Sequence, residues 1–474
     1  MLFCSPLYLA FFLTVFALHW ALPWHRARVA LLVVASFAFY ATFNEWLAVL
    51  VCVSTAADYL VARGLDASAS PRLRRLLLAA SVVGNLGLLC YFKYVNFFLR
   101  SAEDGLRLAG CSASLPVLRV LLPVGISFYT FEAINYTVDV YRRRLPAEKN
   151  LFHFLLFILF FPHLVAGPIV RARDFLPQIA RPKRWSWPRA HLGVQFFALG
   201  LFKKLAVADR LALFADPVFG DPHRYGSAAA WVAMLAYAVQ VYCDFSGYSD
   251  MAIGSAHLLG YKLAKNFDMP YLAPNIAEFW RRWHISLSTW LRDYLFIPLG
   301  GSRGGRWRTC RNLLLTMTLG GLWHGAAWPY VVFGALQGLL LSAHRCFRDC
   351  CGRLPRLESA LRSGPGTALR VATTFLAFCL TLLVFRAATL ADGATLLRRL
   401  FVHTRGARVG MDLGNFWAAV ALVAVCHALA AGGLWRRWAG RLPAPVLGVG
   451  YGAAMTLALL LVPDLGRAFI YFQF

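Results

Sequence analysis

Long apolar blocks separated by short polar segments make up most of this chain. They recur near residues 2–22, 29–57, 76–99, 190–202, 228–243, 312–341, 371–385, 415–434 and 443–463. A helix rises about 1.5 Å per residue, so roughly 20 apolar residues cross the ~30 Å hydrocarbon core of a bilayer. The blocks are too long and too uniformly apolar for the alternating strands of a membrane barrel. The pattern therefore predicts an all-α, polytopic integral membrane protein with roughly nine to eleven membrane segments, some of them re-entrant or horizontal.

Composition agrees with a membrane protein. The chain has 474 residues, of which 59% are hydrophobic, against about 45–50% apolar residues in soluble domains. Residues 1–22 are apolar and lack the basic start of a cleavable signal, so they are expected to stay as the first membrane segment. The eleven cysteines are scattered and form no C-x-x-C pair, which argues against a metal site and against a disulfide framework.

The net charge of +26 would suggest nucleic acid as a partner of a soluble protein. Here the basic residues cluster in the loops between apolar blocks, as expected next to a cytoplasmic membrane surface with anionic lipid. We therefore expect the lipid bilayer and no nucleic acid as partner. Basic loops near 345–370 and 436–441 suggest an orientation that leaves the end of the chain outside the cytoplasm, although the arginines at 398–408 count against it.

Ionisable groups inside apolar sequence are costly and therefore mark candidate functional sites. They gather in residues 242–250, 266–271, 278–294 and 320–328, where His324 lies in an otherwise uncharged block. No internal repeat or soluble linker interrupts the chain, so a single membrane domain, 1–474, is predicted. The candidate site residues are Asp244, Ser246, Tyr248, Asp250, Asn275, Trp283, His284, Ser286, Asp293, Trp323 and His324.

Two of these stretches carry a family resemblance. W-H-x-S-L-x-x-W-L-R-D-Y-L at 283–295, followed by G-L-W-H-G-A-x-W at 321–328, resembles the signature of membrane-bound O-acyltransferases (MBOAT). Segments 91–94, 122–131, 161–169, 242–251 and 299–301 are similar to the branch that acetylates alginate or peptidoglycan. The resemblance covers about residues 90–345, the expected catalytic core, and the aromatic tail 469–474.

The resemblance implies a fold of helices around a central funnel in the bacterial inner membrane. It also implies transfer of an acyl group, in this branch acetyl, from a cytoplasmic thioester such as acetyl-CoA for O-acetylation of an extracytoplasmic polysaccharide. Such proteins bind no permanent cofactor and usually act with an acyl-accepting or esterase-like partner outside the cytoplasm. His324 matches the family's catalytic histidine, and His284 matches its second position.

Imidazole chemistry suits these roles. Acyl transfer from a thioester needs a base for the acceptor's hydroxyl proton, and a buried imidazole stays neutral and can accept it. We expect His324 to be this base; the alternative is a packed or pore-lining histidine. His284 is expected to position the acceptor, to polarise the thioester carbonyl, or only to anchor its helix.

The other candidates are read as tunnel-lining or helix-supporting groups. Buried carboxylates need partners, and Arg281, Arg282 or Lys262 are available to Asp244 and Asp250. Asn275, Glu278 and Trp280 are interpreted in the same way. Residues 162–167, which include His163, are typical of a broken or re-entrant helix, because Pro and Gly at membrane depth need protein or a cavity around them.

The tail Phe469–Phe474 is too short to span and too apolar to be a solvated end. Its aromatic residues suit an interfacial belt. It also resembles the C-terminal tyrosine motif of a small partner in the related D-alanylation machinery, which implies that Tyr471 accepts the acyl group and passes it outward.

Three other functions stay open. Broken helices and midplane polar groups also occur in transporters, but those usually show two related halves, which are not visible here. Two histidines could ligate haem, and D-alanyl transfer to an envelope polymer would use similar residues. No G-x-S-x-G, Walker-type or H-E-x-x-H motif is present, so other common enzyme classes are disfavoured.

Overall fold

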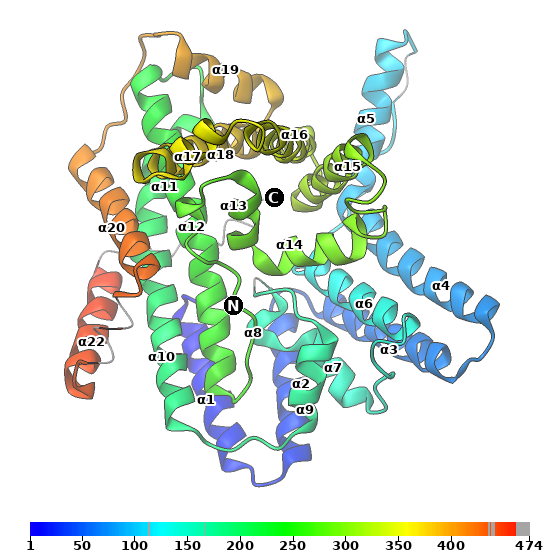
Figure 1. Ribbon diagram of the computed structural model, residues 1–474. Coiled ribbons are helices and arrows are strands. Elements are labelled where there is room, and N and C mark those ends of the chain that lie inside the picture. The colour runs from blue at the N-terminus through cyan, green and yellow to red at the C-terminus, as the bar shows by residue number, and fades with distance from the viewer. Residues whose placement is uncertain (112–113, 166, 435–436, 438–440, 461–474) are drawn as a thin grey trace. The chain divides into compact units, whose positions relative to one another are not determined.

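The computed structural model describes residues 1–111, 114–165, 167–434, 437 and 441–460. Within these residues every regular element is a helix, and the one β-type contact is an isolated bridge between Tyr225 and Ala407 (Figure 1). This confirms the predicted all-α class.

The chain forms two compact units. Unit 1 comprises Met1–Phe197 and Met251–Ala264, and unit 2 comprises Ala198–Asp250 and Lys265–Phe474. Two long helices, α10 (Trp187–Phe202) and α12 (Ser227–Leu258), contribute residues to both units. That the whole chain is one membrane domain stays a prediction.

Unit 1 is built from the N-terminal helices. Local sequence explains where two of these helices begin. The Asn44 side chain caps α3 by accepting a hydrogen bond from the Leu47 amide at 3.0 Å. Helix α4 begins with Pro71 directly after its N-cap Ser70, and both arrangements are common at helix starts. The helices are α1 (Pro6–Ala21), α2 (His25–Ala41), α3 (Glu45–Ala67), α4 (Pro71–Leu89), the π-helix η1 (Cys90–Tyr94), α5 (Val95–Leu108), α6 (Ile126–Tyr141), α7 (Leu151–Leu159), α8 (Phe161–Leu164) and α9 (Ala172–Ala180).

Unit 2 holds the residues that the sequence singled out. It combines long apolar helices with a run of short ones between residues 270 and 296. Its elements are the π-helix η2 (Lys203–Ala208), α11 (Asp209–Gly220), the 3₁₀ turn η3 (Pro270–Leu272), α13 (Ile276–Arg282), α14 (Ile285–Leu291), the π-helix η4 (Arg292–Phe296), α15 (Arg306–His324), α16 (Trp328–Cys351), α17 (Pro355–Arg362), α18 (Gly364–Arg386), α19 (Leu390–Phe401), α20 (Leu413–Ala431) and α22 (Ala444–Leu460).

Five helical stretches among the described residues are long and apolar enough to cross a membrane: Glu45–Ala67, Pro71–Leu108, Ser227–Leu258, Gly364–Arg386 and Leu413–Ala431. In α12, 78% of the span is buried, against 17–33% in the other four. Protein therefore covers most of α12 but only a minor part of the other four spans. The expected nine to eleven segments stay a prediction.

Two of the apolar blocks are interrupted by non-helical residues between two helices. Block 29–57 ends α2 and begins α3, and block 312–341 ends α15 and begins α16. Hydropathy does not register the break after α15, because the connecting residues 325–327 are small and apolar. The break after α2 falls at residues 42–44, which include the polar Thr42 and the α3 cap Asn44. The sequence therefore predicted the apolar character of each block but not its division into two helices.

Helices α15 and α16 pack back to back through glycines. A Cβ on Gly321 would lie 2.7 Å from the Cα of Gly334, and one on Gly338 would lie 2.7 Å from the Cα of Leu314. The paired positions run in opposite directions along the two helices, so the helices are antiparallel and their main chains touch. Small residues permit such close approach between membrane helices, and here they fix the position of His324 at the end of α15.

Candidate active site

The two predicted histidines lie close together in unit 2. His324 is the last residue of α15, and His284 is the N-cap of α14. Both are buried, with 7% and 0% of their surface exposed. The indole of Trp323 packs beside both rings, with centroid distances of 6.1 Å to His284 and 5.1 Å to His324. Three of the predicted site residues therefore form one cluster.

The other neighbours of His324 are aromatic. Phe385 of α18 meets the imidazole edge-on at 5.4 Å between centroids, and Phe333 of α16 does so at 6.4 Å. A side chain on the next residue, Gly325, would overlap the ring of Tyr330. The imidazole of His324 is thus held in an apolar, water-poor environment, where a neutral base is favoured over a charged one.

His284 adopts a left-handed backbone conformation, with φ 43° and ψ 54°. Its ring packs against Phe245 of α12 at 4.6 Å and Phe267 at 6.5 Å. Neither ring nitrogen has a hydrogen-bond partner among the described residues. Burial, and secondarily the charge of His324, holds the pKa of His284 well below its usual value of 6.5, so its ring is neutral at physiological pH.

This lowered pKa gives a prediction for stability. As the pH falls through 6.5, His284 takes up a proton in the unfolded chain but not in the folded chain. The stability that the folded state keeps from the neutral His284 is therefore complete above pH 6.5 and is lost progressively below it. We expect the wild type to lose up to about 1.4 kcal/mol more stability per pH unit on acidification than His284→Gln. Thermal unfolding of the purified protein in detergent between about pH 7.5 and 5.5 measures this difference. Equal slopes for the two proteins would contradict the assignment.

The carboxylates of α12 form ion pairs with lysines, one buried at Asp244 and one partly exposed at Asp250. The Lys204 ammonium lies 2.5 Å from Asp244 and 2.9 Å from Asp209, and Lys203 lies 2.7 Å from Asp250. The expectation that Arg281, Arg282 or Lys262 would pair with Asp244 and Asp250 is wrong. The two lysines are the first residues of the π-helix η2, an element that is frequent at functional sites.

Ser246 and Tyr248 belong to the same layer of α12. Both are about 1% exposed, and the Lys204 ammonium lies 5.7 Å from the centroid of the Tyr248 ring. Phe245, from the same turn, packs on His284. The layer therefore anchors the helix that forms one wall beside His284.

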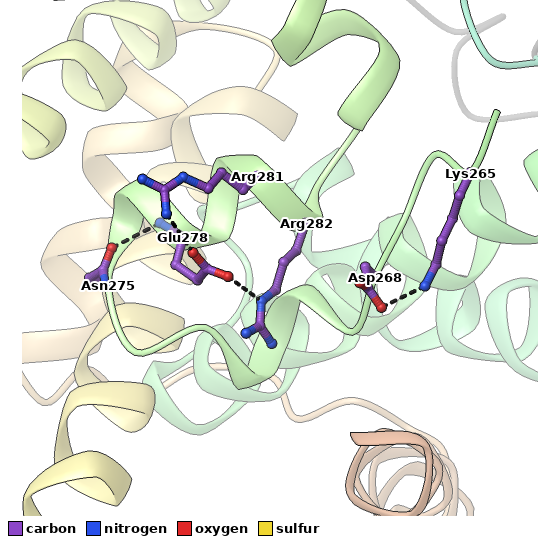
Figure 2. A network of polar contacts seen from close by, with 6 residues as sticks. All are labelled: Lys265, Asp268, Asn275, Glu278, Arg281 and Arg282. Carbon is purple, nitrogen blue, oxygen red and sulfur yellow. Dashed lines mark hydrogen bonds and ion pairs between the residues drawn. The ribbon is translucent and has the colours of Figure 1, made fainter. Parts of the chain in front are cut away.

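The segment before His284 carries a polar network nearer the surface (Figure 2). The Asn275 side chain caps α13 by accepting from the Glu278 amide at 2.8 Å, and Glu278 pairs with Arg281 and Arg282 at 3.0 Å each. Burial alone would raise the pKa of Glu278, but the hydrogen bonds and charges of Arg282 and Arg281 outweigh it and lower that pKa. These contacts secure the short helix that precedes His284.

The remaining predicted residues divide between core and surface. Trp283 is buried against Phe279, with ring centroids 5.5 Å apart, and Ser286 is buried with its hydroxyl 2.9 Å from the Asn266 Oδ1. Asp293 pairs with Arg292 at 2.8 Å, and both are partly exposed. Tyr471 lies outside the described residues.

The sequence that forms this site matches a known protein family. The sequence model of the membrane-bound O-acyltransferase family, MBOAT, matches residues 117–385. The chain belongs to this family. Both histidines, Trp323 and the ion-paired layer of α12 fall within the matched region.

Relatives of this MBOAT protein carry related names. The protein named "Probable alginate O-acetylase AlgI" of Pseudomonas syringae pv. tomato is 44% identical over 349 residues, which cover 73% of this chain and 66% of the relative. The peptidoglycan O-acetyltransferase of Helicobacter pylori is 37% identical, with 73% and 71% covered. The teichoic acid D-alanyltransferase of Bacillus subtilis is 27% identical over 55% of this chain. The chain thus spans slightly less than two thirds of the Pseudomonas syringae relative's length.

The structure adds a third buried histidine to this MBOAT unit. His427 of α20 lies with its ring 4.9 Å from that of Tyr242 and stacked at 5.7 Å on Tyr271. Both tyrosines also contact Trp283, which adjoins His284. His427 lies inside the uncharged block 415–434, as His324 lies inside the uncharged part of block 312–341. The same sequence signal could therefore have identified His427 as a candidate site residue.

Unit 1 contains one further buried pair. His163 lies 3.3 Å from Glu132, whose carboxylate also accepts from the Val170 amide at 2.8 Å. α7 ends at Leu159 and the four-residue α8 follows it, in agreement with the broken helix expected at 162–167. Glu132 was not singled out in the sequence, because a lone carboxylate in an apolar run does not reveal its partner.

Proposed function

We propose that this protein takes an acetyl group from a cytoplasmic thioester, acetyl-CoA, and passes it across the bacterial inner membrane for O-acetylation of an extracytoplasmic polysaccharide. The observation that carries the proposal is the pair of buried histidines that share Trp323 within an aromatic site. Family membership and the names of the relatives support the reaction class. An acyl-accepting or esterase-like protein outside the cytoplasm would complete delivery to the polymer, and no permanently bound cofactor takes part.

In the proposed reaction His324 is the general base. It takes the proton of the acceptor hydroxyl as the oxygen attacks the thioester carbonyl carbon, and the tetrahedral intermediate collapses with cleavage of the carbon–sulfur bond. The departing thiolate then receives the proton from His324. An apolar site suits this cycle, because the imidazole returns to its neutral form after each turnover.

His284 would act on the thioester carbonyl or on the acceptor. Its ring stays neutral and has no hydrogen-bond partner among the described residues. A neutral imidazole can donate one hydrogen bond and accept one, and donation to the carbonyl oxygen would stabilise the charge that develops in the transition state.

The proposed first acceptor is the hydroxyl of Tyr471. We expect Tyr471→Phe to lose covalent labelling by radiolabelled acetyl-CoA while the protein still folds, because the variant lacks only the hydroxyl oxygen that would form the ester. The measurement is label retained on denatured protein. The neighbouring tail variant Phe472→Leu serves as the control and should label like the wild type.

The outcomes of this labelling experiment separate the candidate functions. Label on the wild type but not on Tyr471→Phe supports the relay, whereas equal label on both contradicts it. Binding of acetyl-CoA without any label would move the acceptor to a separate protein. An absence of both binding and label, in a folded protein, would favour a different donor, as in D-alanyl transfer, or a transporter without its own transferase chemistry.

A further inference from the structure

The left-handed conformation of His284 is unusual for a residue with a side chain. Positive φ values are uncommon outside glycine and survive only where the surrounding structure enforces them, often at functional sites. In the described residues only Arg143, Met269 and His284 share this feature. Of these, His284 alone belongs to the proposed active site, so what enforces its conformation bears on catalysis.

Asn266 holds the residues that follow His284 through its side chain and its backbone carbonyl. The Oδ1 of Asn266 accepts from the Ser286 amide at 3.2 Å and from the Ser286 hydroxyl at 2.9 Å, and the Asn266 carbonyl accepts from the Ile285 amide at 2.9 Å. The amide nitrogen of Asn266 donates to the Ser249 hydroxyl on α12 at 3.1 Å. Asn266 therefore ties the start of α14 to the helix that carries Phe245.

The residues before His284 are fixed from the same segment. The Asp268 amide donates to the Arg282 carbonyl at 2.8 Å, and Phe267 packs its ring toward that of His284 at 6.5 Å. Asn266 and Ser249 are each about 1% exposed. Water therefore does not compete for these hydrogen bonds, and an unmet buried partner would be costly.

The imidazole of His284 has no polar anchor of its own among the described residues. Its position is thus set by the backbone turn and by aromatic packing. We propose that Asn266 is a positioning residue for His284: it enforces the left-handed turn that places the imidazole beside Trp323 and His324. This inference rests on the proposed function, in which His284 acts on the reacting groups.

A double-mutant cycle tests the proposal. We expect Asn266→Ala to lower kcat for acetyl transfer about 10- to 100-fold with a smaller change in KM, because a small misplacement of a catalytic group is costly. In the His284→Gln background the same substitution should cost less than about twofold, since residues that act through one another are not additive. Losses that multiply would overturn the proposal.

A matched control separates positioning from general destabilisation. Asn135 is also fully buried, and its side-chain amide donates to the Val170 carbonyl at 3.1 Å in unit 1. Asn135→Ala should lower thermal stability by a similar amount without the selective loss of kcat. If both asparagine variants lose kcat in proportion to stability, Asn266 has only a structural role.

Hydrogen–deuterium exchange gives a readout that does not depend on activity. Asn266→Ala should speed exchange in the peptide that contains residues 283–291, because the Ser286 amide loses its side-chain acceptor, although the Ile285 amide keeps the backbone carbonyl of residue 266. Unchanged exchange there overturns the positioning proposal even if no acetyl transfer is detected. Faster exchange together with an inactive wild type would uphold the positioning of His284 and reject the proposed function.

Discussion

Replacing His324 with alanine is expected to reduce acetyl transfer by about 10²- to 10⁴-fold, the usual contribution of a general base. The reason is local: the imidazole is buried among Trp323, Phe333 and Phe385, where bulk water cannot take over proton removal. The fold should persist, because alanine is a good helix former at this last position of α15 and the substitution removes no charge. Steady-state transfer of radiolabelled acetyl groups to acceptor measures the loss.

A control variant distinguishes loss of the base from loss of packing. His19 of α1 is also buried but has no part in the proposed chemistry, so His19→Ala should retain transfer while losing stability. His324→Gln, which keeps much of the ring's volume, should be as inactive as the alanine variant. A folded His324→Ala protein with wild-type transfer would exclude His324 as the base.

Replacing Lys204 with methionine is expected to have the largest effect on stability. Its ammonium serves two carboxylates, Asp244 at 2.5 Å and Asp209 at 2.9 Å, and all three side chains are at most 3% exposed. Removing one partner of such a buried ion pair typically costs 3–5 kcal/mol, because the opposite charge stays in a low-dielectric surrounding. We expect little folded protein on size-exclusion chromatography and a strongly lowered Tm for what is recovered.

Two comparisons check this cause. In Lys204→Met/Asp209→Asn/Asp244→Asn the uncompensated charges are gone, so part of the stability should return. Lys265→Met breaks a surface pair, in which the side chains of Lys265 and Asp268 are 59% and 56% exposed. This variant should lose at most about 1 kcal/mol of folding stability. If Lys204→Met is no worse than Lys265→Met, the buried pair does not stabilise the fold.

Much of the architecture was predictable from the sequence because hydropathy reports directly on membrane helices. The helical class and the apolar blocks follow from it. The break at the end of α15 does not, because Gly325 and its neighbours are small and apolar. The break at the end of α2 carries a polar signal, since Thr42 and the α3 cap Asn44 stand there. The number of apolar blocks is therefore smaller than the number of helices where one block contains two antiparallel helices, as in α15 and α16.

The sequence motif identified the two histidines of the site. It did not identify the side chains that pair with the other site residues, because those pairs depend on the three-dimensional structure. His284 and His324 were found through their flanking tryptophans and glycines. Lys203 and Lys204 were overlooked because lysines at the end of an apolar block usually turn toward the interface, whereas here they pair with carboxylates of α11 and α12. Asn266 was visible in the sequence, but nothing in its spacing indicates that its side chain bonds to Ser286.

The glycine contact between α15 and α16 bears on how freely this protein can vary. Because the two main chains touch at Gly321 and Gly334, the register of the helix pair does not depend on the side chains that face outward. Leu315, Leu319 and Leu339 are 43%, 48% and 55% exposed. A lineage could exchange these outward leucines for other apolar residues as its lipid composition changes, and His324 would stay where it is.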